Sequence, residues 1–321
     1  MTKSNMIAEW VKKHNKLIIF TVFMGFVVYA FLTVIFNLDT FFETFFASVL
    51  FVLLIIGSIV VAKKTKHTSK DKIKFLNWES LFVFAGVVIT YEISYLFSFS
   101  SVLSSASIGF FGFLFFRKYS IGIYCGSFAG MISIALLNHY QMLIVGIVCV
   151  ISFQIIKTIL DGFGGRLGSI AFVSTTLVSF VFSKSMLEIE FEVIWYLVFV
   201  FAVAGSMISS LIHNQLGKSA VLASALPSLL LAILIDFLFP NLGIYSSIFF
   251  TASFIGMSNK NVITNWTISL IIGIILGIIF LLFLDFFNGF GGKMGLMAFA
   301  SIMVSQGVVY LTKKVKLFIF R

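Results

Sequence analysis

Apolar runs of about 20 residues recur along almost the whole chain, and only short polar stretches separate them. A helix of roughly 20 apolar residues crosses the hydrocarbon core of a bilayer, which is about 30 Å thick. The composition agrees, because 60% of the residues are hydrophobic, only 11% are charged and the mean hydropathy is +1.13. A soluble domain carries about 25% charged residues. The chain is therefore predicted to be an all-α polytopic membrane protein.

Twelve apolar segments are predicted to cross the membrane: 17–37, 41–62, 79–99, 101–116, 119–137, 140–160, 167–183, 193–213, 219–238, 242–258, 264–287 and 294–312. A basic polar loop at 63–78 separates two leading helices, within 1–62, from the rest. The remaining sequence divides into one unit at 79–183 and a second at 184–321, which ends in a basic tail. The short segments 101–116 and 242–258 leave open whether they span the membrane or re-enter it, and we favour full crossings.

The basic residues predict the orientation of these segments. With the N-terminus in the cytoplasm and a change of side at each segment, 20 of the 22 Lys and Arg residues fall inside, and only Lys184 and Lys293 fall outside. An excess of basic residues in cytoplasmic loops is the usual determinant of orientation. The prediction is a multi-pass plasma-membrane protein, of bacterial type, with both termini in the cytoplasm.

The two units repeat each other in sequence. Residues 161–168 read DGFGGRLG and residues 288–295 read NGFGGKMG, and each copy continues into Ala-Phe-x-Ser. A second chance copy of this pattern has odds of roughly one in a thousand. SFAGM at 127–131 matches SFIGM at 253–257 in the same order. Five segments per unit place the two copies in opposite orientations, so the sequence predicts two leading helices plus a five-plus-five inverted repeat, an architecture that recurs in secondary transporters.

Each glycine-rich copy is a candidate substrate site or gate. The copies, named here the first glycine turn (161–168) and the second glycine turn (288–295), each lead into a helix whose first N–H groups lack intrahelical partners. Together with a basic side chain, such a helix start can bind an anion. The alternative is a tight turn whose glycines serve packing alone. The candidate residues are Gly162, Phe163, Gly164, Gly165 and Arg166 in the first turn, and Gly289, Phe290, Gly291, Gly292 and Lys293 in the second.

Two further features are candidates. Ser127 and Ser253 occupy the same place in the SFxGM pair, either on a substrate-lining helix or in a packing seam of small residues. Glu92 is a carboxylate inside the apolar segment 79–99, and such residues are costly in a membrane. It is a candidate for ion coupling, or alternatively a structural hydrogen-bonding group. His139 and His213 are isolated at segment ends and are interpreted as residues at the level of the lipid headgroups.

Other classes of function lack support in the sequence. The chain has no catalytic constellation, nucleotide-binding motif or metal-ligand cluster, so we expect neither an enzyme nor a cofactor or metal protein. Its net charge of +10 comes from residues at segment ends, which argues against a nucleic-acid partner. The leading hypothesis is a secondary-type transporter of a small anionic solute, surrounded by lipid. A passive channel and a non-transport role, in lipid handling or as a scaffold, are the alternatives, and a homo-oligomer or a partner membrane subunit is compatible with each.

Overall fold

The computed structural model describes residues 3–65, 77–157 and 159–319, and side chains within 15–63, 77–157 and 159–317. All the regular structure in these ranges is helical. The α-helices are α1 (Lys3–Phe36), α2 (Phe41–Thr65), α3 (Trp78–Phe97), α4 (Ser101–Phe115), α5 (Ser120–Ala129), α6 (His139–Ile156), α7 (Arg166–Val181), α8 (Trp195–Ser210), α9 (Ala220–Leu238), α10 (Gly243–Gly256), α11 (Trp266–Leu282) and α12 (Lys293–Ile319). Three shorter helical turns are η1 (Arg117–Tyr119), η2 (Leu211–Gln215) and η3 (Pro240–Leu242).

The all-helical prediction is confirmed, and several helices are long and apolar enough for a multi-pass membrane protein. Within the described residues seven candidate spans satisfy length and hydropathy, in α1, α2, α3, α6, α8 with η2, α9 and α12. α4, α7 and α11 are shorter apolar helices. α5 and α10 contain 10 and 14 residues. At about 1.5 Å per residue they reach only about 15 and 21 Å, less than the thickness of a bilayer core.

Two predicted segments are shorter as helices than their apolar sequence suggests. Segment 119–137 is helical only to Ala129, because the chain turns after Gly130 and the Ser133 N–H donates to the carbonyl of Gly289 instead of continuing the helix. Segment 264–287 is helical only to Leu282, and Phe287 then adopts a positive φ of 57°. In segment 119–137 a contact between distant parts of the chain, rather than hydropathy, accompanies the end of the helix. Of the predicted basic loop at 63–78, residues 66–76 lie outside the described residues.

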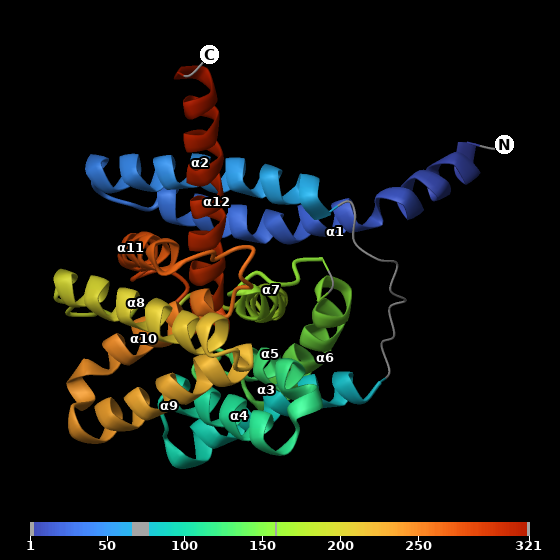
Figure 1. The fold of residues 1–321 in the computed structure, drawn as a ribbon. Coiled ribbons are helices and arrows are strands. Elements are labelled where there is room, and N and C mark those ends of the chain that lie inside the picture. The colour runs from blue at the N-terminus through green and yellow to red at the C-terminus, as the bar shows by residue number, and fades with distance from the viewer. Residues whose placement is uncertain (1–2, 66–76, 158, 320–321) are drawn as a thin grey trace. The chain divides into compact units, whose positions relative to one another are not determined.

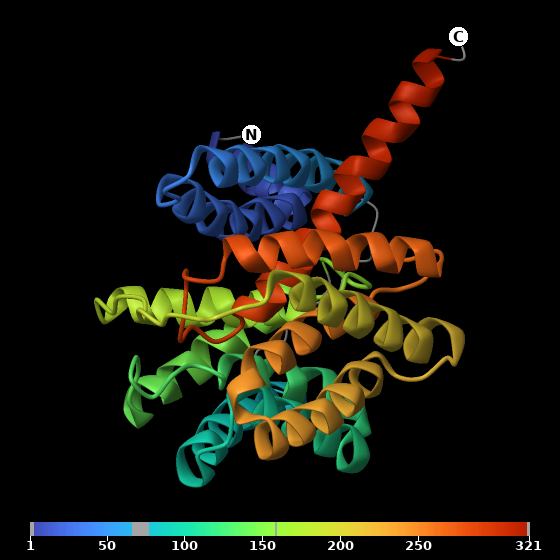
Figure 2. The same ribbon diagram turned by 90° about the vertical axis from the view of Figure 1, so that its left-hand side faces the viewer.

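The chain forms two compact units. Unit 1 comprises Met1–Ile73, Ile155–Asp161 and Met303–Arg321. Its helices α1 and α2 lie side by side in both views (Figures 1 and 2). Within the unit α2 meets the last part of α12 at two glycines, because a side chain added at Gly57 would meet the backbone of Met303 and one added at Gly307 would meet that of Leu53. These glycines allow the two helix backbones to touch.

Unit 2 comprises Lys74–Gln154 and Gly162–Ile302, and most of its helices form two groups. Figure 1 shows α3 to α6 on one side of the unit and α8 to α11 on the other. In the first group α3 packs on α5, and a side chain at Gly86 would meet the backbone of Ile123. In the second group α8 packs on α10, where a side chain at Gly205 would meet the backbone of Phe249. The groups meet where α4 packs on α9.

The centre of unit 2 is the crossing of α7 with the start of α12. Gly168 and Gly295 face each other there, and a Cβ on either glycine would collide with the backbone of the other. The Ser169 hydroxyl donates to the Gly295 carbonyl at 3.4 Å, and the Thr175 hydroxyl donates to the Gly291 carbonyl at 2.8 Å. Both helices start from the glycine turns, so this crossing fixes the positions of the two turns.

Candidate functional site

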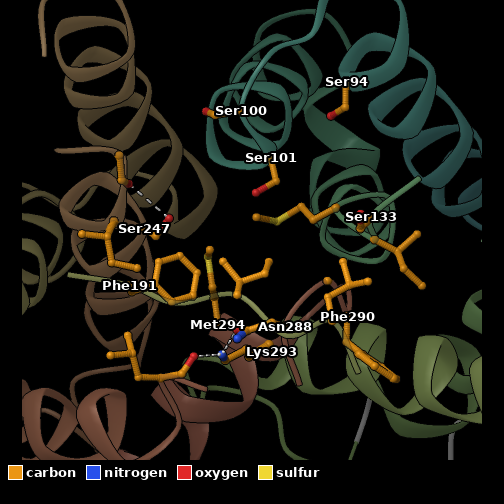
Figure 3. A pocket seen from close by; sticks show the side chains of 18 of the residues that line it. Ser94, Ser100, Ser101, Ser133, Phe191, Ser247, Asn288, Phe290, Lys293 and Met294 are labelled. Carbon is orange, nitrogen blue, oxygen red and sulfur yellow. Dashed lines mark hydrogen bonds between the residues drawn. The ribbon is translucent and has the colours of Figure 1, made fainter. Parts of the chain in front are cut away.

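A cavity of about 720 Å³ opens within unit 2 and is the candidate site (Figure 3). Binding cavities for small molecules are typically about 300–1,000 Å³. Its wall draws on both groups of helices and on the connections between them. The lining residues are Ser94, Phe99, Ser100, Ser101, Met131, Ile132, Ser133, Ile134, Leu187, Ile189, Glu190, Phe191, Glu192, Pro240, Asn241, Gly243, Ile244, Ser247, Phe280, Leu284, Asn288, Gly289, Phe290, Gly292, Lys293, Met294 and Met297.

The second glycine turn forms one wall of this cavity. Gly289 and Gly292 have φ values of +84° and +81°, a conformation that favours glycine, and the chain then enters α12 at Lys293. The Lys293 ammonium donates to the Asn288 Oδ1 atom at 2.7 Å and to the Leu284 carbonyl at 3.2 Å. These two bonds hold the ammonium group against the turn, at the wall of the cavity.

Asn288 supplies a second donor beside Lys293. The residue is only 4% exposed, and its Oδ1 atom accepts the bond from Lys293, so its Nδ2 atom points away from that bond. Nδ2 is buried and has no hydrogen-bond partner among the described residues. A buried donor without an acceptor is unfavourable, which makes this atom a candidate ligand contact.

The other lining residues are mostly apolar, with hydroxyl groups and two carboxylates among them. Ser100 and Ser101 lie across the cavity from Asn288 and Lys293 (Figure 3). Among the described residues that line the wall, Lys293 is the one basic side chain, and Glu190 and Glu192 are both exposed. Asp285 also acts electrostatically on Lys293, but it is exposed and does not line the cavity. The cationic end of the cavity is therefore confined to the second glycine turn.

The first glycine turn has the same backbone but does not line this cavity. Gly162 and Gly165 have φ values of +84° and +72°. The Gly164 N–H donates to the Ser258 hydroxyl at 2.9 Å, and the Asn259 N–H donates to the Gly162 carbonyl at 2.9 Å. Arg166 is only 8% exposed, while Phe163 is half-buried, and neither lines the cavity.

The two turns pack reciprocally against the opposite group of helices. A side chain at Gly164 would meet the backbone of Phe254, near the end of α10. A side chain at Gly291 would meet the backbone of Ala129, at the end of α5. The packing interpretation of the glycines therefore has direct structural support in both turns, and the second turn combines packing with exposure to a cavity.

Ser127 and Ser253 are fully buried and do not line the cavity. The Ser127 hydroxyl lies 2.9 Å from that of Ser105 in α4, and the Ser253 hydroxyl lies 2.7 Å from that of Ser224 in α9. Ser224 also bonds the Tyr124 hydroxyl at 2.9 Å, which links α9 to α5. The contacts of both serines join helices, as the packing alternative describes.

Glu92 has a partner that sequence reasoning did not assign to it. Its Oε1 atom lies 2.7 Å from His139 Nδ1, and the two side chains are 37% and 45% exposed. The rings of Tyr91 and Tyr95 lie edge-on to the imidazole, at centroid distances of 5.4 and 4.8 Å. The interpretation of His139 as an isolated residue is therefore wrong, because the fold places the start of α6 beside the second half of α3.

Much of the cavity wall also escaped sequence reasoning. Residues 131–134 read as part of an apolar span, and residues 187–192 read as an external loop, yet both line the cavity. Irregular backbone at membrane depth is tolerated where it lines a cavity or is buried in protein. In the sequence, Gly130 and Ser133 are the residues that could have indicated a break in the helix at this point. By themselves, however, small residues of this kind do not distinguish a helix break from a packing seam.

Comparisons with protein-family models, with curated proteins and with solved structures gave no match to this chain. Among the described residues, no group of three or more His, Cys, Asp or Glu side chains is placed to hold a metal ion. The function proposed for this chain therefore rests on the geometry of unit 2.

Proposed function

We propose that this multi-pass helical protein is a secondary-type transporter that moves a small anionic solute by alternating access. The single observation that carries the proposal is the cavity whose wall combines both groups of helices and ends at Lys293 and Asn288. A site shared by two similar groups can be exposed to either side of the membrane when the groups move against each other. Lys293 gives one end of this wall a positive charge, while the two glutamates in the lining are exposed, and that end favours a negatively charged group of a solute.

The proposed architecture is an inverted repeat of α3–α7 and α8–α12. The matching sequence motifs, the similar φ values in the two glycine turns and the reciprocal packing on α10 and α5 support it. Inversion requires an odd number of crossings in each copy. That number is five when every helix crosses, as the sequence predicts, and three when α4 with α5, and α9 with α10, form re-entrant pairs. Both arrangements orient the second copy opposite to the first.

The distribution of basic residues predicts the side of the membrane to which this cavity opens. The segments that line it, including 131–134, 187–192 and 288–294, all lie at or near the ends assigned to the outside by the distribution of Lys and Arg. We therefore propose that the structure corresponds to an outward-facing state. The first glycine turn then lies at the inner side, with its bonds to Ser258 and Asn259 in place.

Glu92 with His139 is the proposed coupling site. A carboxylate within an apolar helix and hydrogen-bonded to a histidine is the kind of pair from which transporters build proton relays. Ser94, two residues after Glu92, lines the cavity, and so do residues 131–134, which precede α6 and His139. Movement of α3 or of the start of α6 would therefore change both the cavity and the pair.

The proposal is tested with purified protein in liposomes. Saturable uptake of a labelled anion, accelerated by unlabelled anion on the opposite side, is expected of a carrier, and Glu92→Gln is expected to retain exchange while losing uptake driven by a proton gradient. Flux that neither saturates nor shows counterflow would indicate the channel alternative. If no solute moves and glycine-turn variants change stability alone, a scaffold or lipid-handling role takes precedence.

The topology has its own test. Single cysteines at Lys218 and Glu188, both exposed in the structure, are to be labelled in intact cells with an impermeant maleimide. The charge-based topology predicts labelling at position 188 and protection at position 218 until the membrane is permeabilised, because α8 lies between them. Labelling of both positions from the outside would contradict a crossing by α8 and the topology that depends on it.

A further inference from the structure

We infer that the cavity binds a small monocarboxylate with an apolar chain or ring, its carboxylate at Lys293 and Asn288. The inference rests on the proposed function and narrows it to a class of substrate. Three properties of the wall carry it: a pair of donors at one end, a largely apolar lining, and carboxylates among the remaining charged groups.

The donor pair fits a group with two acceptor oxygens on one carbon. Lys293 Nζ and the Asn288 amide are held together by their 2.7 Å bond, so the ammonium and the unpaired Nδ2 belong to one polar patch. One carboxylate oxygen can accept from the ammonium, and the other can accept from Nδ2 once the amide turns this buried atom toward the cavity. This arrangement would satisfy the amide N–H that the protein itself leaves without a partner.

Apolar side chains near this patch provide room for the rest of the solute. Met294 and Met297 follow Lys293 on α12, while Phe280 and Leu284 approach from the end of α11. Methionine adapts its shape to different apolar ligands. Each methylene group buried against such a wall raises affinity about fourfold, which is about 0.8 kcal/mol converted to a ratio.

The charges of the wall oppose a second negative group. Lys293 is the one cation, whereas Glu190 and Glu192 contribute two carboxylates, so the lining as a whole is negative. A dianion could pair one charge with Lys293, and its second charge would face an apolar wall or these glutamates. We therefore expect dicarboxylates and divalent phosphate to bind much more weakly than monocarboxylates.

The experiment measures thermal shift and equilibrium binding of the purified full chain with acetate, butyrate, hexanoate, succinate, inorganic phosphate and hexylamine. Affinity is expected to rise by at least tenfold from acetate to hexanoate, with succinate, phosphate and hexylamine at least tenfold weaker than hexanoate. A short-chain phosphatidic acid is included because a lipid phosphate shares the combination of anion and apolar chain. Tighter binding of that lipid than of hexanoate would overturn the inference in favour of a lipid site.

Lys293→Met tests the site, and Lys184→Met is its matched control. Lys184 is the other cation assigned to the outside, is exposed and does not line the cavity. Hexanoate binding is expected to fall at least tenfold in Lys293→Met and to be unchanged in Lys184→Met. Should Lys293→Met fail to fold, Asn288→Leu removes the second donor and keeps the lysine, with an expected loss of about threefold to tenfold. Equal binding of hexanoate by the wild type and by a folded Lys293→Met or Asn288→Leu variant would overturn the inference.

The outcomes separate this inference from the proposed function. Monocarboxylate binding that depends on Lys293, without flux in liposomes, would support the site and reject the transporter. Saturable flux of a solute that does not compete with hexanoate would support the transporter and reject the monocarboxylate site.

Discussion

The two glycine turns have nearly the same sequence and the same backbone, yet they differ in their surroundings. At the first turn the Gly164 N–H is bonded to Ser258 and Arg166 is buried. At the second turn Lys293 and Asn288 line a cavity of about 720 Å³. In sequence the first turn combines Asp161 with Arg166, whereas the second combines Asn288 with Lys293 and leaves a net positive charge. One motif therefore serves packing in both halves, and the residues around it decide whether it can also bind a ligand.

The largest expected effect tests what the turns share. Gly165→Ala and Gly292→Ala each place a side chain at positive φ against backbone, of Phe299 in the first case and of Ala171 in the second. Backbone strain of about 1–2 kcal/mol and overpacking of about 1–3 kcal/mol sum to an expected loss of about 2–5 kcal/mol in each variant. Unfolding of the purified protein by denaturant in detergent measures this loss.

Gly217→Ala is the control for these two variants. Gly217 also has a positive φ, of 64°, but has no atom within 4 Å of an added side chain. We expect its loss to be limited to the strain of about 1–2 kcal/mol. A tolerated substitution at either Gly165 or Gly292 would contradict the equivalence of the two turns.

The next largest loss of stability is expected from removing a hydrogen bond that is specific to the first turn. Ser258→Ala removes the hydroxyl that accepts from Gly164 and leaves a buried N–H without that acceptor, at an expected cost of about 1–3 kcal/mol. Ser301→Ala is the control, because the Ser301 hydroxyl bonds only the Met297 carbonyl within its own helix, and a change below about 0.5 kcal/mol is expected. Thermal denaturation of the Ser258→Ala and Ser301→Ala variants measures the two losses of stability. Equal losses in the two would show that the Gly164 bond contributes nothing specific.

The third prediction concerns a substitution that gives the second turn the same pairing of an acidic with a basic residue as the first turn has. Asn288→Asp places a carboxylate beside the Lys293 ammonium, which neutralises the cationic end of the cavity and removes the Nδ2 donor. Loss of a charge-assisted contact of about 1.4 kcal/mol lowers anion affinity about tenfold, with the folded state retained. Titration with hexanoate measures the affinity. Undiminished binding would mean that the difference in charge between the turns has no role in recognition.

The smallest expected effect on stability is at Glu92, where the halves differ most plainly. The corresponding position of the second half is close to Leu211, so the pair with His139 has no counterpart there. Because both side chains are partly exposed, Glu92→Gln is expected to cost about 0.2–1 kcal/mol. Thermal denaturation checks this value, and His139→Gln should match it. A loss above about 2 kcal/mol would identify the pair as structural rather than as a coupling site.

Sequence reasoning was most successful where hydropathy alone decides the outcome. Each of the twelve apolar segments overlaps one α-helix, because a continuous apolar run in a membrane must satisfy its backbone within a helix. It was less successful for segment 119–137, where α5 ends at Ala129. The bond from the Ser133 N–H to the Gly289 carbonyl joins positions 156 residues apart in the chain, and no local pattern predicts such a contact.

The sequence by itself determined the helical class, the apolar segments and the motif that occurs twice, because these depend on composition and on local order. The tertiary structure alone decided that Asn288 and Lys293 share a cavity with residues 131–134 and 187–192, and that Glu92 meets His139. The physical reason is that a cavity is the space left between elements after packing. Its wall depends on how closely backbones approach at residues such as Gly168 and Gly295, and that approach is a property of pairs of distant segments.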